Sequence, residues 1–463
     1  MKLKNIIMIA LMPVAMMASC KKELELKDPQ GLDPETALSN DANIKKVLQG
    51  GYNDLSAGSL YGGDIQLLGD LLGSDGELTW VGTFNNYREI WGKNIITTNS
   101  LVSGMWISAY SAINIANNVL ANIDKVADAD KARVEGEALF IRAAMHFELV
   151  RFFAKDYTDG SPATNPGVPV ITTPTNSTND ITRPTRNSVA EVYAAVIADL
   201  TKAISLLPAT NTVYATKAVA GTILSRVYLQ KADYAMAAAT ASDAITAATG
   251  KALLPTFMAN FNQSANTGED LFTIQVSDQD GVNGLHTYYS VDIFGGRDGD
   301  IEVNDTHLDL YQTGDLRKAF TTNPGVNTSF NTPFYTKYGA FRTTKWKEIY
   351  KNPKVARLAE LYLTRAEANF RMGTAVGATP LSDVNRVHSG ARTGLAELAA
   401  ITLDDIYLER RRELAFEGFG IHDAKRFKRT IDGLAWNSDE LVLPIPFREL
   451  NANSSLTQNP GYN

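Results

Sequence analysis

Three stretches of the sequence combine aromatic rings with hydrogen-bonding side chains, which is the chemistry that recognises sugars. A Trp or Tyr ring stacks on the apolar C–H face of a sugar, while Asn, Asp or Arg side chains bond its hydroxyl edges. The first stretch, which also holds Phe84 and Arg88, lies within residues 80–88, the second within 288–297 and the third within 342–346. The predicted ligand contacts are Trp80, Asn85, Tyr87, Tyr288, Tyr289, Phe294, Arg297, Arg342 and Trp346. For each of these residues considered alone, packing in the core is a better explanation than contact with a ligand. As a set, they predict that two or more line a ligand site, since loops on a rigid scaffold commonly carry binding.

Catalytic chemistry has less support in the sequence. A glycosidase needs two carboxylates that flank the scissile bond, and Asp64, Asp70, Asp75 and Glu77 cluster in one glycine-rich stretch. Solvated acids in turns explain this cluster better, because turns often carry Asp. The five histidines are scattered without a His-Glu-x-x-His zinc motif, and there is no Gly-x-Ser-x-Gly nucleophile elbow. We therefore expect that the chain is not an enzyme, with a glycan-cleaving enzyme as the alternative.

Two groups of oxygen-bearing side chains could bind calcium. They are Asp278, Asp280 and Asn283, and Asp298, Asp300 and Glu302. Calcium prefers such oxygen ligands, but neither group follows the complete calcium-loop pattern. Plain polar turns explain both groups better, so we expect no cofactor.

The N-terminus has the features of a cleaved export signal. Lys2 and Lys4 precede an apolar run over residues 6–18, which is shorter than the roughly 20 residues that span a bilayer. Small residues, Ala18 and Ser19, stand directly before Cys20, the only cysteine of the chain. This arrangement resembles a bacterial lipobox, with Met17 where Leu is favoured. We expect residues 1–19 to be a signal peptide and Cys20 to be acylated, which anchors the protein to a membrane without spanning it.

The overall charge bears on possible partners. The chain has 44 basic and 51 acidic residues and a formal net charge of −7, without basic tracts. An acidic protein of this kind is a poor partner for nucleic acid, whose phosphates require Lys and Arg. We therefore expect no nucleic-acid partner.

Helical periodicity covers most of the remaining chain and predicts a mainly α fold. Apolar residues recur every three or four positions within residues 36–56, 106–117, 134–152, 188–207, 215–230, 234–248, 353–371 and 403–419. Tyr228, Ala237 and Ala244 match the offsets of the 34-residue tetratricopeptide repeat, in which small residues let two helices cross closely. The sequence thus favours tetratricopeptide-like helix pairs over an ordinary helical bundle.

The helical pattern is interrupted by polar segments. Residues 20–36 are predicted to be a lipidated tether, and residues 37–463 a single domain with loop-rich insertions near 57–100 and 250–350. A short strand is predicted over residues 269–276. The fold expected is therefore a helical scaffold with long irregular loops and few strands. Loops this long in a compact protein are usually functional or disordered, and their aromatic content argues against disorder.

An ordered series of motifs extends along the chain. The earlier ones lie within residues 106–117, 137–143, 167–170, 191–208 and 357–368. The most specific one joins Glu409, Arg410, Glu413 and the run Phe416-Glu417-Gly418 to Asp423, and residues 443–446 and 458–462 form a C-terminal motif. In this order, the motifs resemble those of the SusD/RagB family of nutrient-binding outer-membrane lipoproteins of the Bacteroidetes. The acids and arginines of these motifs recur at helical spacing, where opposite charges pair across a turn, so we expect them to be structural.

The resemblance implies a function. The protein would bind an oligosaccharide or polysaccharide, or less often a peptide, at the cell surface. It would be lipid-anchored in the outer membrane and would cap a SusC-like TonB-dependent transporter. A helical-repeat scaffold that binds only protein is a further alternative, and it would use a concave helix face in place of the loops.

Overall fold

The computed structural model describes residues 34–462 except residue 264 and residues 323–330. The predicted signal peptide, the predicted acylation site Cys20 and most of the predicted tether lie outside these residues. The first described element is the short helix α2 (Pro34–Ala37), which falls at the end of the predicted tether. Of the helices that the structure describes, none is long and apolar enough to cross a membrane.

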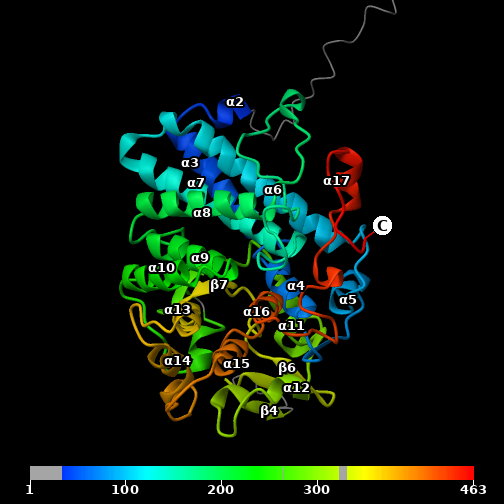
Figure 1. Ribbon diagram of the computed structural model, residues 1–463, viewed down its shortest axis with the longest axis vertical. Helices are drawn as coiled ribbons and strands as arrows, with labels where there is room; N and C mark the ends of the chain where they lie inside the picture. The colour runs from blue at the N-terminus through cyan, green and yellow to red at the C-terminus, as the bar shows by residue number, and fades with distance from the viewer. Residues whose placement is uncertain (1–33, 264, 323–330, 463) are drawn as a thin grey trace, which may run out of the picture.

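A row of helices forms the scaffold, as predicted (Figure 1). Its members are α3 (Asp41–Leu55), α6 (Ser100–Ala121), α7 (Asp128–Phe153), α8 (Val189–Leu206), α9 (Lys217–Gln230), α10 (Tyr234–Ala247) and α13 (Leu358–Met372). Each packs against the next in this order, and α14 (Pro380–His388) and α15 (Leu403–Glu413) follow α13. Segments more than 100 residues apart, such as α10 and α13, are thus neighbours in space.

Local sequence explains where these helices begin and end. The side chain of Ser188 accepts a hydrogen bond from the backbone N–H of Glu191, whose carboxylate accepts one from Ser188 N in return. This capping box satisfies N–H groups that a helix leaves free at its start. Leu207 ends α8 directly before Pro208, which cannot continue a helix.

The tetratricopeptide-like crossing is confirmed at α9 and α10. Tyr228, Ala237 and Ala244 are all buried at this interface. A Cβ atom added to Gly221 of α9 would lie 3.0 Å from Cβ of Ala244, which is tighter than ordinary packing. Small residues are therefore required where the two helices cross.

The predicted loop over residues 57–100 is wrong in one respect, because it contains a buried helix. All nine residues of α4 (Asp64–Leu72) are buried, including Asp64 and Asp70. The helix packs so closely on residues 418–421 that a Cβ on Gly69 would lie 2.3 Å from the carbonyl oxygen of Gly418. Strand β1 (Leu78–Trp80) and helix α5 (Asn85–Trp91) follow. The carboxylates of α4 are thus not the solvated turn acids that the sequence suggested.

Residues 250–350 also contain more regular structure than predicted. Strand β2 (Asp270–Thr273) is found where a strand was expected and pairs with β7 (Lys354–Arg357), which replaces the start of the predicted helix. A five-stranded sheet has the order β1-β3-β6-β5-β4. Its other strands are β3 (Ile301–Val303), β4 (Phe320–Thr322), β5 (Phe334–Lys337) and β6 (Ala340–Thr343). The short helices α11 (Gly284–Tyr289) and α12 (Asp305–Leu308) complete this region.

The charged late motif is structural, but its partners differ from those expected. Helix α15 ends at Glu413, so Glu417 lies beyond it. Glu409 pairs with Arg412 across one turn at 3.7 Å, and Asp423 with Arg426 at 2.9 Å, but most partners of the acids lie far away in the sequence. Arg357 donates hydrogen bonds to Glu269, Glu413 and Glu417 at 2.7–2.9 Å, and Arg317 donates to Glu409 at 2.6 Å. This buried network joins β7 to the segment that follows α15.

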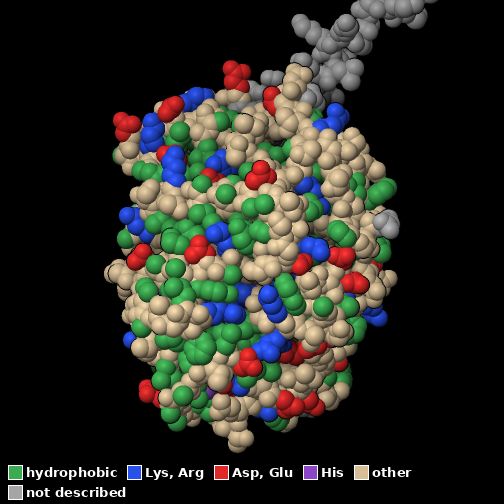
Figure 2. Space-filling view, viewed as in Figure 1, with side chains coloured by type: hydrophobic (Ala, Val, Ile, Leu, Met, Phe, Trp, Pro, Cys, Tyr) green, Lys and Arg blue, Asp and Glu red, His purple; other side chains and the backbone are tan. Residues whose placement is uncertain are grey.

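The C-terminal residues return to the scaffold. Helix α16 (Gly420–Arg426) packs on α4, and Leu443 N donates a hydrogen bond to Phe152 O at the end of α7. The C-terminal segment also contains a short helix, α17 (Phe447–Ala452). Acidic and basic side chains are interspersed over the face shown in Figure 2.

Candidate functional site: an aromatic surface at β1, α5 and α11

Strand pairing brings two of the predicted aromatic stretches together. Strand β1 pairs antiparallel with β3, with Trp80 opposite Ile301. Val81 N extends the pairing by donating to Asp300 O at 2.9 Å. Residues 80–88 therefore lie beside residues 284–300, although about 200 positions separate them in the sequence.

Four aromatic rings meet at this junction. Trp80 stacks on Tyr87 with ring centroids 4.8 Å apart and an interplanar angle of 23°. Tyr288 of α11 packs against Tyr87 at 4.5 Å and against Trp80 at 5.8 Å. Phe84 meets the edge of Tyr288 at 6.2 Å. We call Phe84, Tyr288 and Arg297, which face outward from this cluster, the aromatic surface.

The aromatic surface is open to solvent. The exposed fraction of Phe84 is 40 % and that of the neighbouring Val81 is 45 %, while Tyr288 is half-buried. Arg297 places its guanidinium carbon 4.3 Å from the centroid of the Phe84 ring. It also donates to Asp300 Oδ2 at 2.9 Å and to Thr83 Oγ1 at 3.2 Å. A guanidinium stacked on an exposed ring offers an apolar face and hydrogen-bond donors side by side.

Buried groups hold the rings in place from below. The hydroxyl of Tyr87 donates to Asp64 Oδ1 at 2.6 Å. Burial raises the pKa of Asp64 to about 6, and the hydrogen bond from Tyr87 opposes this rise. Above that pH the carboxylate of Asp64 is ionised and accepts a hydrogen bond from the Tyr87 hydroxyl, which fixes the orientation of the Tyr87 ring. A Cβ on Gly82 would lie 2.7 Å from the Trp80 ring, so only glycine fits there.

Trp80 and Tyr87 support the site from within, because both are buried. None of the described residues accepts a hydrogen bond from the indole N–H of Trp80. Asn85 is the exposed first residue of α5, next to Phe84, so it lies at the rim of the aromatic surface. Arg88 is also exposed and donates to Gly82 O at 2.7 Å.

Four predicted ligand contacts lie outside the four-ring cluster, and the predictions for the three that are buried are corrected by the structure. Tyr289 is buried and donates to Asp70 at 3.2 Å. Trp346 is buried against Phe261 and donates to Phe416 O at 2.9 Å. Arg342 is buried under the 299–302 segment, where it bonds Gly299 O and Glu302. Phe294 packs against Tyr335 of β5, away from the four-ring cluster. Core packing explains the first three, since a buried ring or guanidinium offers no surface to a sugar.

Five of the six candidate calcium ligands, all except Asp278, already have partners in the protein. Asp298 pairs with Lys337, Asp300 with Arg297 and Glu302 with Arg342. In the other group, Asp280 accepts from Ser277 and Asn283 caps α11. Within the described residues, no group of three or more His, Cys, Asp or Glu side chains is arranged to hold a metal ion.

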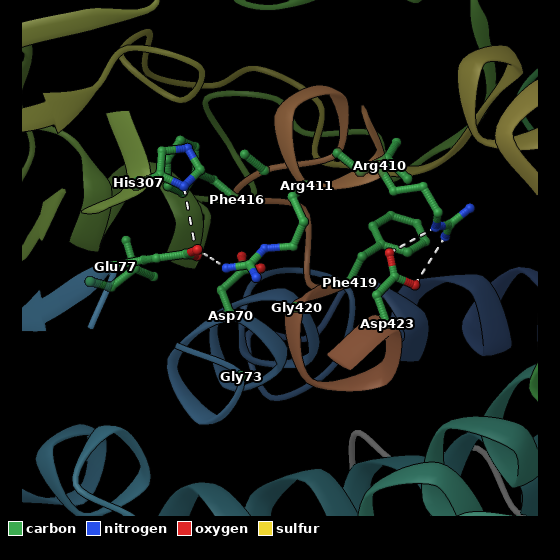
Figure 3. Close-up of a pocket in the computed structure, with 13 residues that line it drawn as sticks. Asp70, Gly73, Glu77, His307, Arg410, Arg411, Phe416, Phe419, Gly420 and Asp423 are labelled. Carbon is green, nitrogen blue, oxygen red and sulfur yellow. Dashed lines mark hydrogen bonds and ion pairs between the residues drawn. The ribbon is translucent and has the colours of Figure 1, made fainter. Parts of the chain in front are cut away.

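Two of the four carboxylates considered for catalysis, Asp70 and Glu77, line a small cavity between α4, α15 and α16 (Figure 3). Glu77 lies between His307 and Arg411, and Arg410 pairs with Asp423. Burial raises the pKa of Asp70, which also lines the cavity, to about 7. The cavity volume is about 40 Å³, whereas ligand pockets span roughly 300–1,000 Å³. It therefore has room for water and not for a sugar ring.

The sequence analysis did not predict which side chains of the candidate site face solvent. Phe84 was noted beside the predicted contacts, but nothing in the sequence indicated that it, and not Trp80, faces outward. The supporting role of Asp64 was missed because α4 was not recognised. The available signal for a buried helix was the segment from Ile65 to Leu72, in which five of the eight residues are Ile or Leu.

The fold defines a tetratricopeptide-like scaffold protein that carries an exposed aromatic surface outside its helical row. A family model described as "Starch-binding associating with outer membrane" matches residues 24–229, and one described as "SusD family" matches residues 285–441. The chain belongs to the SusD/RagB family.

Two known proteins resemble the chain, the first over nearly its whole length and the second over a shorter segment. SusD-like protein P2 of Formosa agariphila is 28% identical, over 94% of this chain and 96% of that protein. The starch-binding protein SusD of Bacteroides thetaiotaomicron is 31% identical over 119 residues, or 23% of this chain and 21% of that protein.

Solved structures share the fold. A putative sugar binding protein from Bacteroides vulgatus has a TM-score of 0.75 at 27% identity, and 91% of this chain and 98% of that chain are covered. A SusD superfamily protein from the same species has a TM-score of 0.79 at 23% identity, with 92% and 99% covered.

Proposed function

We propose that this protein is a non-catalytic lipoprotein of the bacterial outer membrane that captures an oligosaccharide at the cell surface. The aromatic surface is the binding site. The bound sugar is then passed to a SusC-like TonB-dependent transporter.

The observation that carries the proposal is the convergence of Phe84, Tyr288 and Arg297 from separate loops into one exposed surface. A sugar ring laid on Phe84 and Tyr288 would cover apolar area that is now exposed. Arg297, with Asn85 at the rim, supplies donors and acceptors for its hydroxyl groups. The rings beneath are locked by packing, so little conformational freedom is lost on binding.

The location and partner follow from the family and the N-terminus. Acylation of Cys20 would anchor the chain after cleavage of the export signal. The matching family model is described as associating with the outer membrane, which supports the proposed location. The transporter is proposed because proteins of this family are expected to act with one.

Binding without cleavage is favoured by the placement of the acids. Asp64 is bonded to Tyr87, and Asp300 is bonded to Arg297. The carboxylates of the cavity in Figure 3 are closed off from any sugar. A glycosidase would need two carboxyl groups with access to one glycosidic bond.

Affinity electrophoresis tests this function directly. The protein would be run through native gels that contain starch, laminarin, xylan, galactomannan, alginate or heparin, and the same mixtures would be assayed for new reducing ends. Retardation by at least one polysaccharide without release of reducing ends supports the proposal. Release of reducing ends would establish an enzyme, and free migration in every gel would favour a scaffold that binds only protein.

A further inference from the structure

A groove lies on the helical side of β2, built from elements that do not belong to the aromatic surface. Two hollows of about 240 Å³ and about 310 Å³ share the lining residues Val213, Tyr214 and Thr273. The first is bounded by α3 and the second by the end of α10. The three shared residues place the two hollows side by side with Tyr214 at their boundary, and we call the pair the groove. The second hollow alone reaches the lower end of the range of ligand sites.

Tyr214 is presented to the groove in a fixed position. Its ring lies 4.7 Å from that of Tyr52, which packs in turn on Phe272 at 6.4 Å. The backbone of Thr212 has φ of 44°, an unusual conformation for a β-branched residue. No described residue bonds the hydroxyl of Tyr214. The groove thus contains a half-buried aromatic ring with an unused polar tip.

Amide side chains border the ring on α3. Gln49 and Asn53 are four residues apart, so they lie on the same face of the helix. Both line the first hollow and both are exposed. Neither side-chain amide is hydrogen-bonded to any residue that the structure describes. Each offers a donor and an acceptor to a ligand.

Asp270 lines the second hollow and holds a buried carboxylate oxygen without a donor among the described residues. Asp270 is 2 % exposed, and its Oδ2 accepts from Lys354 Nζ at 2.6 Å and from Thr267 N at 2.7 Å. Its Oδ1 has no partner among the described residues. A buried acceptor left unsatisfied costs about 1–3 kcal/mol, so it calls for a partner.

We propose that this groove is a second oligosaccharide-binding site, specific for a neutral glycan. A half-buried aromatic ring and exposed free amides suit the C–H faces and hydroxyl groups of a sugar. The charged side chains that line the groove are Asp270, Asp280 and Lys251, so it does not favour a sulfated or uronic chain. The class of ligand rests on the proposed function, while the location does not. Two sites on one chain would strengthen the hold on a long polysaccharide.

The test compares variants of the two sites in the same native gels. The set is the wild type, Phe84→Ala, Tyr214→Ala, the pair Gln49→Ala with Asn53→Ala, and Phe84→Ala combined with Tyr214→Ala. Starch, laminarin, xylan and galactomannan are the neutral probes, and alginate and heparin the anionic ones. Gln312→Ala, an exposed amide outside the groove, is the control. Melting temperatures of all variants would confirm that they fold.

We expect Tyr214→Ala to weaken binding of a neutral polysaccharide roughly thirtyfold and the amide pair roughly tenfold. The combination with Phe84→Ala should abolish retardation. If Tyr214→Ala and the amide pair are retarded as strongly as the wild type, the second site is overturned and the proposed function still stands. If the groove variants lose binding while Phe84→Ala binds like the wild type, the groove is the binding site and the aromatic surface is not. Retardation by anionic chains only, or by none, overturns the neutral-glycan groove.

Discussion

Replacing Arg357 with Met should destabilise the protein by about 3–5 kcal/mol, because a buried ion network would lose its central cation. The guanidinium of Arg357 is fully buried and bonds Glu269, Glu413 and Glu417. Arg392 still reaches Glu269 and Glu413, but Glu417 would keep only Lys345. The methionine fills similar volume, so the loss reports charge and hydrogen bonding more than packing.

The loss should also depend on pH. Burial alone raises the pKa of Glu417, but Arg357 and Lys345 outweigh it, so the pKa lies below its usual range. A depressed folded pKa adds stability that is present above the unfolded pKa and is lost as pH falls through the folded value. Without Arg357 the pKa of Glu417 rises, and a proton can neutralise the stranded carboxylate. The deficit should therefore shrink between pH 7.5 and pH 5.

Urea unfolding followed by circular dichroism at both pH values measures this deficit. Unfolding entropy is about 2.1 cal/mol/K per residue, so for 463 residues the melting temperature should fall by roughly 3–5 °C. Arg448→Met is the control, since Arg448 is 74 % exposed and should matter by less than about 0.5 kcal/mol. A deficit below about 1 kcal/mol, or one that is the same at both pH values, would refute the reasoning.

Three further predictions follow from buried and terminal positions. Burial raises the pKa of Asp70 from 3.8 to about 7, so the fold binds an extra proton between these values and loses stability as pH rises. The stability of Asp70→Asn relative to the wild type should therefore increase by up to about 4 kcal/mol between pH 4 and pH 8. If urea unfolding gives the same difference in free energy of unfolding between the two proteins at both pH values, this prediction is contradicted. Ala237→Trp and Ala244→Trp should each lower stability by about 1–3 kcal/mol or more through overpacking between α9 and α10; unchanged melting of both would refute the close crossing. Cys20→Ala should release the protein from membranes, since the tether would lose its acyl chain; sedimentation with membranes in high salt would argue against the anchor.

The helical scaffold could be predicted because its signal is local. The apolar positions of α7 from Val134 to Phe152 repeat every three or four residues, and all of them are buried. The small residues of α10 likewise match a known repeat. Short strands such as β3 carry only three residues, and their pairing with β1 depends on contacts more than 200 positions away. No local pattern could have revealed them.

The amino-acid composition predicted which segments form the candidate site, but it did not predict which of their side chains face solvent. The aromatic stretches at residues 80–88 and 288–297 do meet, whereas Arg342 and Trp346 turn inward. A Trp in a loop sequence can face solvent or core, and only the sheet register decides. Trp80 lies in β1 with its ring on the Tyr87 side, which leaves Phe84 to face solvent. The long-range ion pairs of Glu413 and Glu417 were equally invisible, because their partners come from β7 and from the segment that precedes α15.

Calorimetric titration of the aromatic-surface variants tests the central claim most directly. The titrant is an oligosaccharide cut from the polysaccharide that retards the wild type. Phe84→Ala and Tyr288→Ala should each weaken binding by about 2 kcal/mol, or roughly thirtyfold in Kd, with little change in melting temperature. Phe320→Ala should bind like the wild type, because this exposed Phe lies on β4 at the opposite edge of the sheet from β1. Equal Kd values for all four proteins would contradict the assignment of Phe84, Tyr288 and Arg297 as the sugar-binding surface.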